Sequence, residues 1–153
     1  MEKSRLSQSL LTDRHLPGES EALLPRNGPA NLDSWRLAVD TAHSNEEFQQ
    51  LAERLLASSR QAMSESLWAL LFERWSEFAP KAMINFAEAI VGHASTKAIQ
   101  EMAYFAWASR QPETALAKAR FCSTAIQHAA LEGAVAAQPD KAAAFVLSLP
   151  NAQ

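Results

Sequence analysis

The chain contains few of the residues that build strands, phosphate-binding loops and disulfides. Glycine occurs only four times among 153 residues, and valine and isoleucine are scarce. So few glycines cannot build most phosphate or dinucleotide loops, and neither those motifs nor a nucleophile elbow is present. The single cysteine, Cys122, cannot form an internal disulfide, so nothing in the sequence indicates an oxidising compartment.

The sequence also lacks a basic surplus and a long apolar run. Its net charge is −3 and its isoelectric point about 5.8, which disfavours nucleic acid as a principal partner. No apolar run approaches the roughly 18 residues of a membrane span, and no signal-peptide stretch follows Lys3 and Arg5. We therefore expect a soluble, cytoplasmic protein without a membrane span, while export by another route stays open.

Alanine is the abundant residue and makes up roughly a fifth of the chain. It is the strongest helix former, whereas β-branched residues are typical of strands. Hydrophobic residues account for 48% of the chain, so the composition as a whole does not indicate disorder. The length fits one domain with one core. The composition therefore predicts an all-α protein with closely packed helices.

We expect the chain to have two parts. Residues 1–31 are interrupted by prolines and glycines, namely Pro17, Gly18, Pro25, Gly28 and Pro29. These residues break any sustained helical period, which predicts an extended or flexible N-terminal arm. The arm is either a loose tail or a leucine-bearing segment that docks on a partner or on the rest of the chain. Residues 32–153 are the predicted helical-repeat domain.

Within residues 32–153, capping residues and prolines mark where helices begin. Ser44 with Glu47 three positions later matches a capping box, and proline suits the first helical turn because its missing N–H has no partner there. The fourth helix is expected to end at Gly92, as a C′ glycine. The predicted caps or first residues are Asp33 or Ser34, Ser44, Ser64, Pro80, Ser95, Pro112, Ser123 and Pro139.

Three segments repeat one pattern, in which an apolar or small residue is followed five positions later by proline and then by alanines. The pairs are Trp75–Pro80, Trp107–Pro112 and Ala134–Pro139. Because proline disfavours helical backbone in the residue before it, we predict breaks between helices at Ala79, Gln111 and Gln138. The units begin at Ser64, Ser95 and Ser123, roughly 30 residues apart, a spacing typical of helical repeats.

Between Ser64 and Pro150 this pattern resembles degenerate α-solenoid repeats of the tetratricopeptide and HEAT-like class. The resemblance implies a right-handed stack of about four antiparallel helical hairpins that binds a protein or peptide on a concave face, without catalysis. The chain departs from the tetratricopeptide pattern, because alanine or apolar residues stand where that pattern has a glycine and the repeats are shorter. No ligand residue can therefore be transferred to this chain.

The third and fifth predicted helices are apolar over most of their circumference. A helix of that kind is buried between neighbours. We expect these two helices to form the spine of the domain, with Trp75 and Trp107 in its core. The alanines of the later helices should let them approach closely.

Aromatic and apolar residues are the candidates for partner binding, because Trp and Tyr are favoured at interface hot spots. Two of them lie toward the edges of apolar helical faces, although filling the core is the commoner role of such residues. Two others belong to a last helix without a polar cap, which indicates a fragment of a longer array, a covering chain or a homo-oligomer. The candidates are Trp68, Tyr104, Phe145, Leu149, Leu10 and Leu11.

No catalytic or metal-binding set emerges from the sequence. The histidines show no mutual metal-ligand spacing; they are His15, His43, His93 and His128. Glu73 and Glu77 share one helix face, but with Arg74 beside them we expect a solvated surface rather than paired catalytic acids. The sequence therefore predicts no enzyme activity, no metal and no cofactor.

The sequence favours a non-catalytic protein–protein interaction module, a scaffold or accessory subunit of a larger assembly. Two other classes stay open. One is a helical domain of a larger enzyme, such as a cell-wall lytic enzyme, which the gene sequence beyond Gln153 would reveal. The other is a self-assembling structural protein in which the arm of one copy covers the apolar end of the next.

Overall fold

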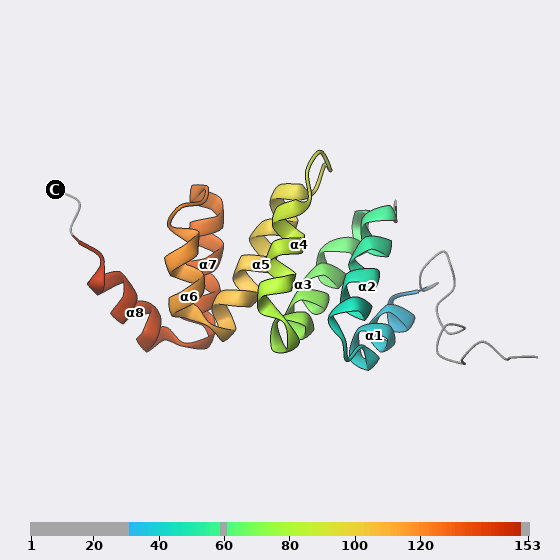
Figure 1. The fold of residues 1–153 in the computed structure, drawn as a ribbon, viewed down its shortest axis with the longest axis horizontal. Helices are drawn as coiled ribbons and strands as arrows, with labels where there is room; N and C mark the ends of the chain where they lie inside the picture. The colour runs from blue at the N-terminus through green and yellow to red at the C-terminus, as the bar shows by residue number, and fades with distance from the viewer. Residues whose placement is uncertain (1–30, 59–60, 151–153) are drawn as a thin grey trace, which may run out of the picture.

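The computed structural model describes residues 31–58 and 61–150, which form eight helices and no strand (Figure 1). The all-α class predicted from composition is confirmed for these residues. The arm expected at 1–31 lies outside them except for its last residue. In chain order the helices are α1 (Leu32–Thr41), α2 (Asn45–Ala57), α3 (Gln61–Phe78), α4 (Pro80–Ala89), α5 (Thr96–Arg110), α6 (Pro112–Ala119), α7 (Thr124–Ala137) and α8 (Pro139–Ser148).

Most helices begin where the sequence predicts. The capping box of α2 is present in both directions: the Ser44 hydroxyl accepts from the Glu47 N–H, and the Glu47 carboxylate accepts from the Ser44 N–H. Ser123 caps α7 in one direction only, since its hydroxyl oxygen accepts from the Ile126 N–H. Prolines occupy the first position of α4, α6 and α8. These starts are decided by local hydrogen bonding and backbone geometry, which is why they can be found without tertiary information.

Three helix boundaries differ from the prediction. The α1 cap is Asn31 rather than Asp33 or Ser34, because its Oδ1 accepts a hydrogen bond of 2.8 Å from the Ser34 N–H. Helix α3 begins at Gln61, three residues before Ser64. Helix α4 ends at Ala89, where the chain turns extended, so Gly92 lies in the connection with a φ of 73° instead of closing the helix.

The three predicted breaks are confirmed and share one backbone conformation. Ala79, Gln111 and Gln138 have φ between −133° and −146° and a ψ of 68°. Each donates its N–H to the carbonyl four residues earlier and accepts from the N–H four residues later. One residue therefore ends a helix and begins the next. The proline that follows lies at the first helical position, where no backbone partner is needed.

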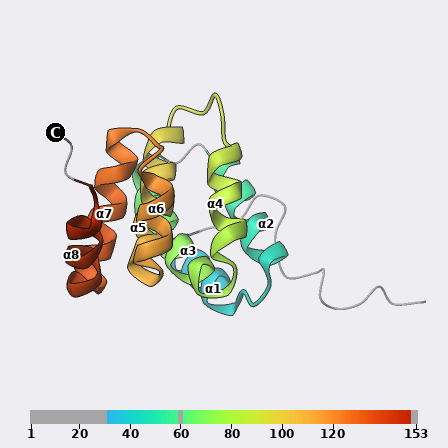
Figure 2. The same cartoon turned by 60° about the vertical axis from the view of Figure 1, so that its left-hand side comes forward.

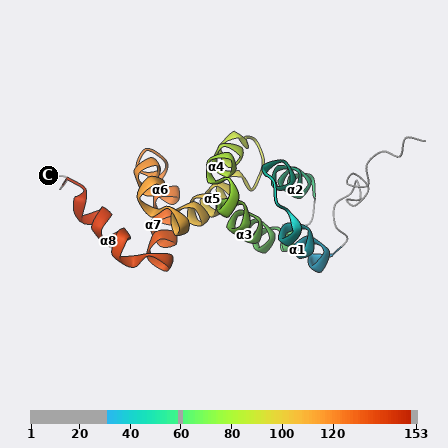
Figure 3. The ribbon, with the colours of Figure 1, turned by 60° about the horizontal axis from the view of Figure 1, so that its bottom comes forward.

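The helices follow one another along the long axis of the molecule (Figure 1). The odd-numbered helices contact each other in chain order, α1 with α3, α3 with α5 and α5 with α7. Helices α2, α4 and α6 lie on one side of that row, as Figure 3 shows. Figure 2 places α7 and α8 at one end and α2 at the other. None of the helices in residues 31–58 and 61–150 is long and apolar enough to cross a membrane.

Helix α5 is the centre of the packing, since it contacts α3, α4, α6 and α7. Its approach to α7 depends on Gly133. A Cβ atom added there would lie 2.2 Å from the carbonyl oxygen of Phe105, far inside van der Waals contact. The two helices can thus pack at this separation only because one of them lacks a side chain at the crossing.

The core between α2, α3 and α4 is aromatic. Trp75 is completely buried and packs between Phe48, Phe72 and Phe86, with ring centroids 5.4–6.5 Å apart. Its indole N–H donates to the side-chain oxygen of Asn45 at 2.9 Å. The core position expected for this tryptophan is therefore the observed one.

The spine prediction holds for most of α5 but not for every apolar residue on it. Trp107 is buried, as expected, whereas Phe105 keeps 41% of its surface exposed and Met102 is half-buried. A helix that is apolar all round was expected to be covered on every side. The uncovered side of α5 opens onto a groove.

Candidate functional site

The groove has a volume of about 620 Å³ and is built by α3, α5 and α7. It is partly open to solvent rather than enclosed. Its lining combines small, apolar and charged side chains from these three helices. The lining residues are Ala69, Glu73, Glu101, Met102, Phe105, Ala106, Ser109, Arg110, Ala129, Glu132, Ala136 and Ala137.

Small residues account for the hollow. The α7 side of the groove is lined largely by alanines, whose side chains cannot reach across to α3. Gly133 draws the α7 backbone against Phe105 at the same place. Met102 and Phe105 then form an apolar floor, which the other described residues leave partly uncovered. A concave apolar surface with a few polar groups around it is the usual form of a binding site.

The charges around the groove are mostly negative. Glu73 comes from α3, Glu101 from α5 and Glu132 from α7, while Arg110 is the one cation of the lining. Within the described part of the chain, the side chain of Glu73 makes neither a hydrogen bond nor an ion pair. The other two carboxylates have weak neighbours within their own helices, at 3.9 Å for Glu101–Lys97 and 3.5 Å for Glu132–His128.

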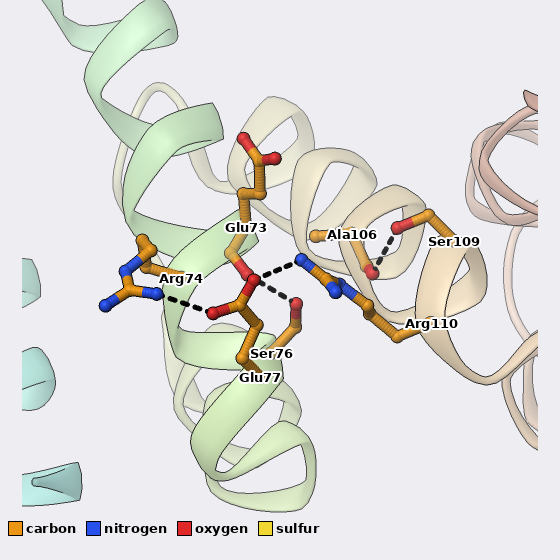
Figure 4. A network of polar contacts seen from close by, with 7 residues as sticks. All are labelled: Glu73, Arg74, Ser76, Glu77, Ala106, Ser109 and Arg110. Atoms are coloured by element: carbon orange, nitrogen blue, oxygen red, sulfur yellow. Dashed lines mark hydrogen bonds and ion pairs between the residues drawn. The ribbon is translucent and has the colours of Figure 1, made fainter. Parts of the chain in front are cut away.

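Arg110 is already paired at the edge of the groove (Figure 4). Its guanidinium contacts one carboxylate oxygen of Glu77, and Arg74 binds the other oxygen at 2.6 Å. The network ties the end of α3 to the end of α5. Figure 4 also shows that the carboxylate of Glu73 points away from this network. The residues Glu73 and Glu77, which share a face by spacing, thus have different surroundings.

A second polar cluster ties α4, α5 and α6 together outside the groove. The Tyr104 hydroxyl donates to Glu88 at 2.7 Å and lies 3.4 Å from the Cys122 sulfur, and Lys118 binds the other Glu88 oxygen at 2.8 Å. Burial, followed by the contacts with Cys122 and Glu88, raises the pKa of Tyr104 far above its ordinary value. The phenol therefore stays neutral and acts as a structural donor.

The Glu88 carboxylate should make stability depend on pH. Burial raises its pKa, but the hydrogen bonds from Lys118 and Tyr104 and the charge of Lys118 outweigh burial, so the net pKa lies below 4.5. A lowered folded-state pKa stabilises the protein above the unfolded value, and that stability is lost as pH falls through the folded value. We expect the free energy of unfolding to decrease when the pH is lowered below about 4.5. In Glu88→Gln this decrease should be smaller by about 0.5 kcal/mol, a value that allows for solvent screening of the exposed ion pair.

Urea unfolding at pH 7, 5 and 3.5 measures this effect. Glu113→Gln is the matched control, because Glu113 is an exposed acid on α6 and makes no ion pair within the described residues. An equally steep fall in the Glu88→Gln variant would contradict the assignment. Glu47 contributes in the same direction, since the backbone N–H groups of His43 and Ser44 lower its pKa.

The residues proposed from the sequence as partner contacts are not brought together. Trp68 and Tyr104 are buried in the core, with at most 3% of their surface exposed. On the last helical segment, Phe145 is half-buried and Leu149 is 39% exposed. Leu10 and Leu11 lie outside the described residues. A partner role for these six residues stays a prediction.

Sequence reasoning missed the groove. A fifth helix that is apolar over most of its circumference predicts burial of Met102 and Phe105, and no motif marks Glu101 or Glu132. The available signal was indirect: α7 is rich in alanine and contains a glycine, so it has few side chains large enough to cover Phe105. Which face of α5 remains uncovered depends on how α3 and α7 pack against it. A local sequence pattern cannot predict that packing.

No group of three or more His, Cys, Asp or Glu side chains suited to a metal ion occurs among the described residues. His43, His93 and His128 lie on three separate elements or connections, and His15 is outside the described ranges. His93 has a local role, since its Nδ1 accepts from the Ser95 N–H at the start of α5. The histidines therefore suggest no shared chemistry.

Comparison with protein-family models, with curated proteins and with solved structures finds no match for this chain.

Proposed function

We propose that this chain is a non-catalytic protein–protein interaction module, a scaffold or accessory subunit that holds a segment of a partner protein in the groove of α3, α5 and α7. The observation that carries the proposal is the exposed apolar floor of the groove. Phe105 lines a hollow of about 620 Å³ and leaves 41% of its surface exposed. Covering such a surface is favourable by about 25 cal/mol per Å² of apolar area.

The proposal includes an α-solenoid-like arrangement, a right-handed stack of about four antiparallel hairpins, as in helical repeat proteins. It is supported by the common backbone conformation at Ala79, Gln111 and Gln138 and by the consecutive contacts of the odd-numbered helices. In such arrays one row of helices lines an extended binding surface. The groove lies on one row of helices, α3, α5 and α7, which supports its role as such a binding surface.

The absence of catalysis is part of the proposal and is motivated by where shifted titratable groups lie. The groups with shifted pKa values among the described residues are Glu47, Glu88 and Tyr104. Each makes hydrogen bonds that cap a helix or join helices, and none lines the groove. Active sites usually gather such groups in a cleft.

The experiment that tests the proposal is affinity capture with a filled groove. Ala136 is an exposed residue of the groove lining, so Ala136→Trp should occupy the hollow without disturbing the core. Ala117→Trp is the matched control, because Ala117 is an exposed alanine on α6 outside the groove. We expect a partner to be recovered from native extract by the wild type and by Ala117→Trp, with recovery at least tenfold lower for Ala136→Trp.

Equal recovery by all three baits would contradict binding in the groove. Recovery of further copies of the bait alone would favour self-assembly instead. That alternative has its own motivation, since Leu147 is 85% exposed and Val146 47% exposed on α8.

A further inference from the structure

We infer that the segment bound in the groove is basic and apolar: an apolar side chain covers Phe105 and Met102, and flanking Lys or Arg side chains face Glu73, Glu101 and Glu132. This inference rests on the proposed function and names the chemistry of the partner. The apolar floor makes the groove a binding surface, and the charges around it select the occupant.

The apolar part of the segment follows from the exposed ring. Phe105 and Met102 form the apolar part of the lining together with alanines from all three helices, and none of these side chains can make a hydrogen bond. A polar side chain placed against them would lose its water without gaining a partner, which is unfavourable. An aliphatic or aromatic side chain would instead remove the exposed ring surface from water.

The basic part follows from charge complementarity. Each of the three helices that build the groove contributes one carboxylate. Arg110 is the lining's one cation, so the lining keeps a net charge of −2 even when Arg110 is counted. Lys97 and His128 are on the helices of the carboxylates they approach, and their own side chains are 77% and 73% exposed. Such exposed neighbours are weakly held and can be displaced by a bound cation.

An acidic segment is disfavoured by the same arrangement. It would bring like charges toward the three carboxylates, which is unfavourable. Repulsion of this kind is a common source of specificity between partners. Complementary charge should also speed association at low salt.

Selection from a random 12-residue peptide library displayed on phage tests the inference with the full chain as bait. Clones are kept only when they bind the wild type and Ala117→Trp but not Ala136→Trp. We expect these groove-dependent clones to be enriched in Lys and Arg on both sides of an apolar residue and depleted in Asp and Glu.

A fluorescein-labelled peptide made from the most frequent clone then measures the contribution of charge. Each exposed ion pair contributes up to about fivefold in affinity, so Glu73→Gln/Glu101→Gln/Glu132→Gln should weaken binding about tenfold at low salt. The control neutralises three exposed acids away from the groove, Asp40→Asn/Glu53→Gln/Asp140→Asn, and should change the affinity less than twofold. For the wild type, affinity should fall as salt is raised.

The outcomes separate the two proposals. Groove-dependent clones without basic residues, or equal affinities for the two triple variants, would overturn the basic partner and leave the interaction module in place. A library that returns no clone sensitive to Ala136→Trp would overturn both. Circular dichroism of each variant checks that its helices are retained. The salt dependence of binding is measured on the wild type, so it tests the role of charge without any variant.

Discussion

Replacing Gly133 with alanine is expected to destabilise the protein by about 3 kcal/mol, although alanine is normally the better helix residue. At an ordinary helical position, replacing glycine with alanine would stabilise the helix by about 1 kcal/mol. Here the new Cβ would lie 2.2 Å from the Phe105 carbonyl oxygen and 2.9 Å from its carbonyl carbon. These are backbone atoms of α5, which cannot swing aside as a side chain would, so α5 and α7 must separate. Overpacking of this kind typically costs about 1–3 kcal/mol, occasionally more.

Urea unfolding followed by far-ultraviolet circular dichroism measures the effect of Gly133→Ala. Val135→Ala is the control on the same helix, since Val135 is 49% exposed and its truncation should change stability by less than about 0.5 kcal/mol. A Gly133→Ala protein as stable as the wild type would mean that the α5–α7 crossing is wider than the structure has it. Because Phe105 belongs to both the crossing and the groove floor, the same variant should also bind the selected peptide more weakly.

Trp75→Ala is expected to cost about 3–5 kcal/mol, the range for removing a large aromatic side chain from a core. The indole is fully buried and contacts aromatic rings from α2, α3 and α4, so its loss opens a cavity where three helices meet. It also leaves the Asn45 side chain without its hydrogen-bond donor. Since small domains are stable by only about 5–15 kcal/mol, the variant should be close to unfolding at 37 °C.

The same unfolding measurement separates the contribution of the buried ring from that of its hydrogen bond to Asn45. Trp75→Phe keeps an aromatic ring but removes the N–H, and should cost less than Trp75→Ala. Asn45→Ala leaves the indole N–H unpaired and should cost about 1–2 kcal/mol. Leu37→Ala is the control, because Leu37 is 65% exposed and its loss should be nearly neutral. A Trp75→Ala protein whose free energy of unfolding lies within about 1 kcal/mol of the wild-type value would contradict the assignment of this residue to the core.

The helical class and most helix starts could be predicted from local sequence patterns. Ser44, Ser123 and the prolines at positions 80, 112 and 139 act on their immediate neighbours, through a hydrogen bond to a nearby N–H or through a restricted backbone. The breaks at Ala79, Gln111 and Gln138 follow from the same short-range effects. These features could be predicted because their cause spans only a few residues.

Which apolar residues are covered depends on how the helices pack against one another. Trp68 and Phe105 both belong to helices with broad apolar faces, yet one is buried and the other lies at the floor of a groove. The difference depends on where α7 crosses α5, which Gly133 and the surrounding alanines permit. Glu73, Glu101 and Glu132 are far apart in the chain and reach one groove for the same reason. Burial and charge clustering depend on helix packing over long sequence separations, so no local pattern could have specified them.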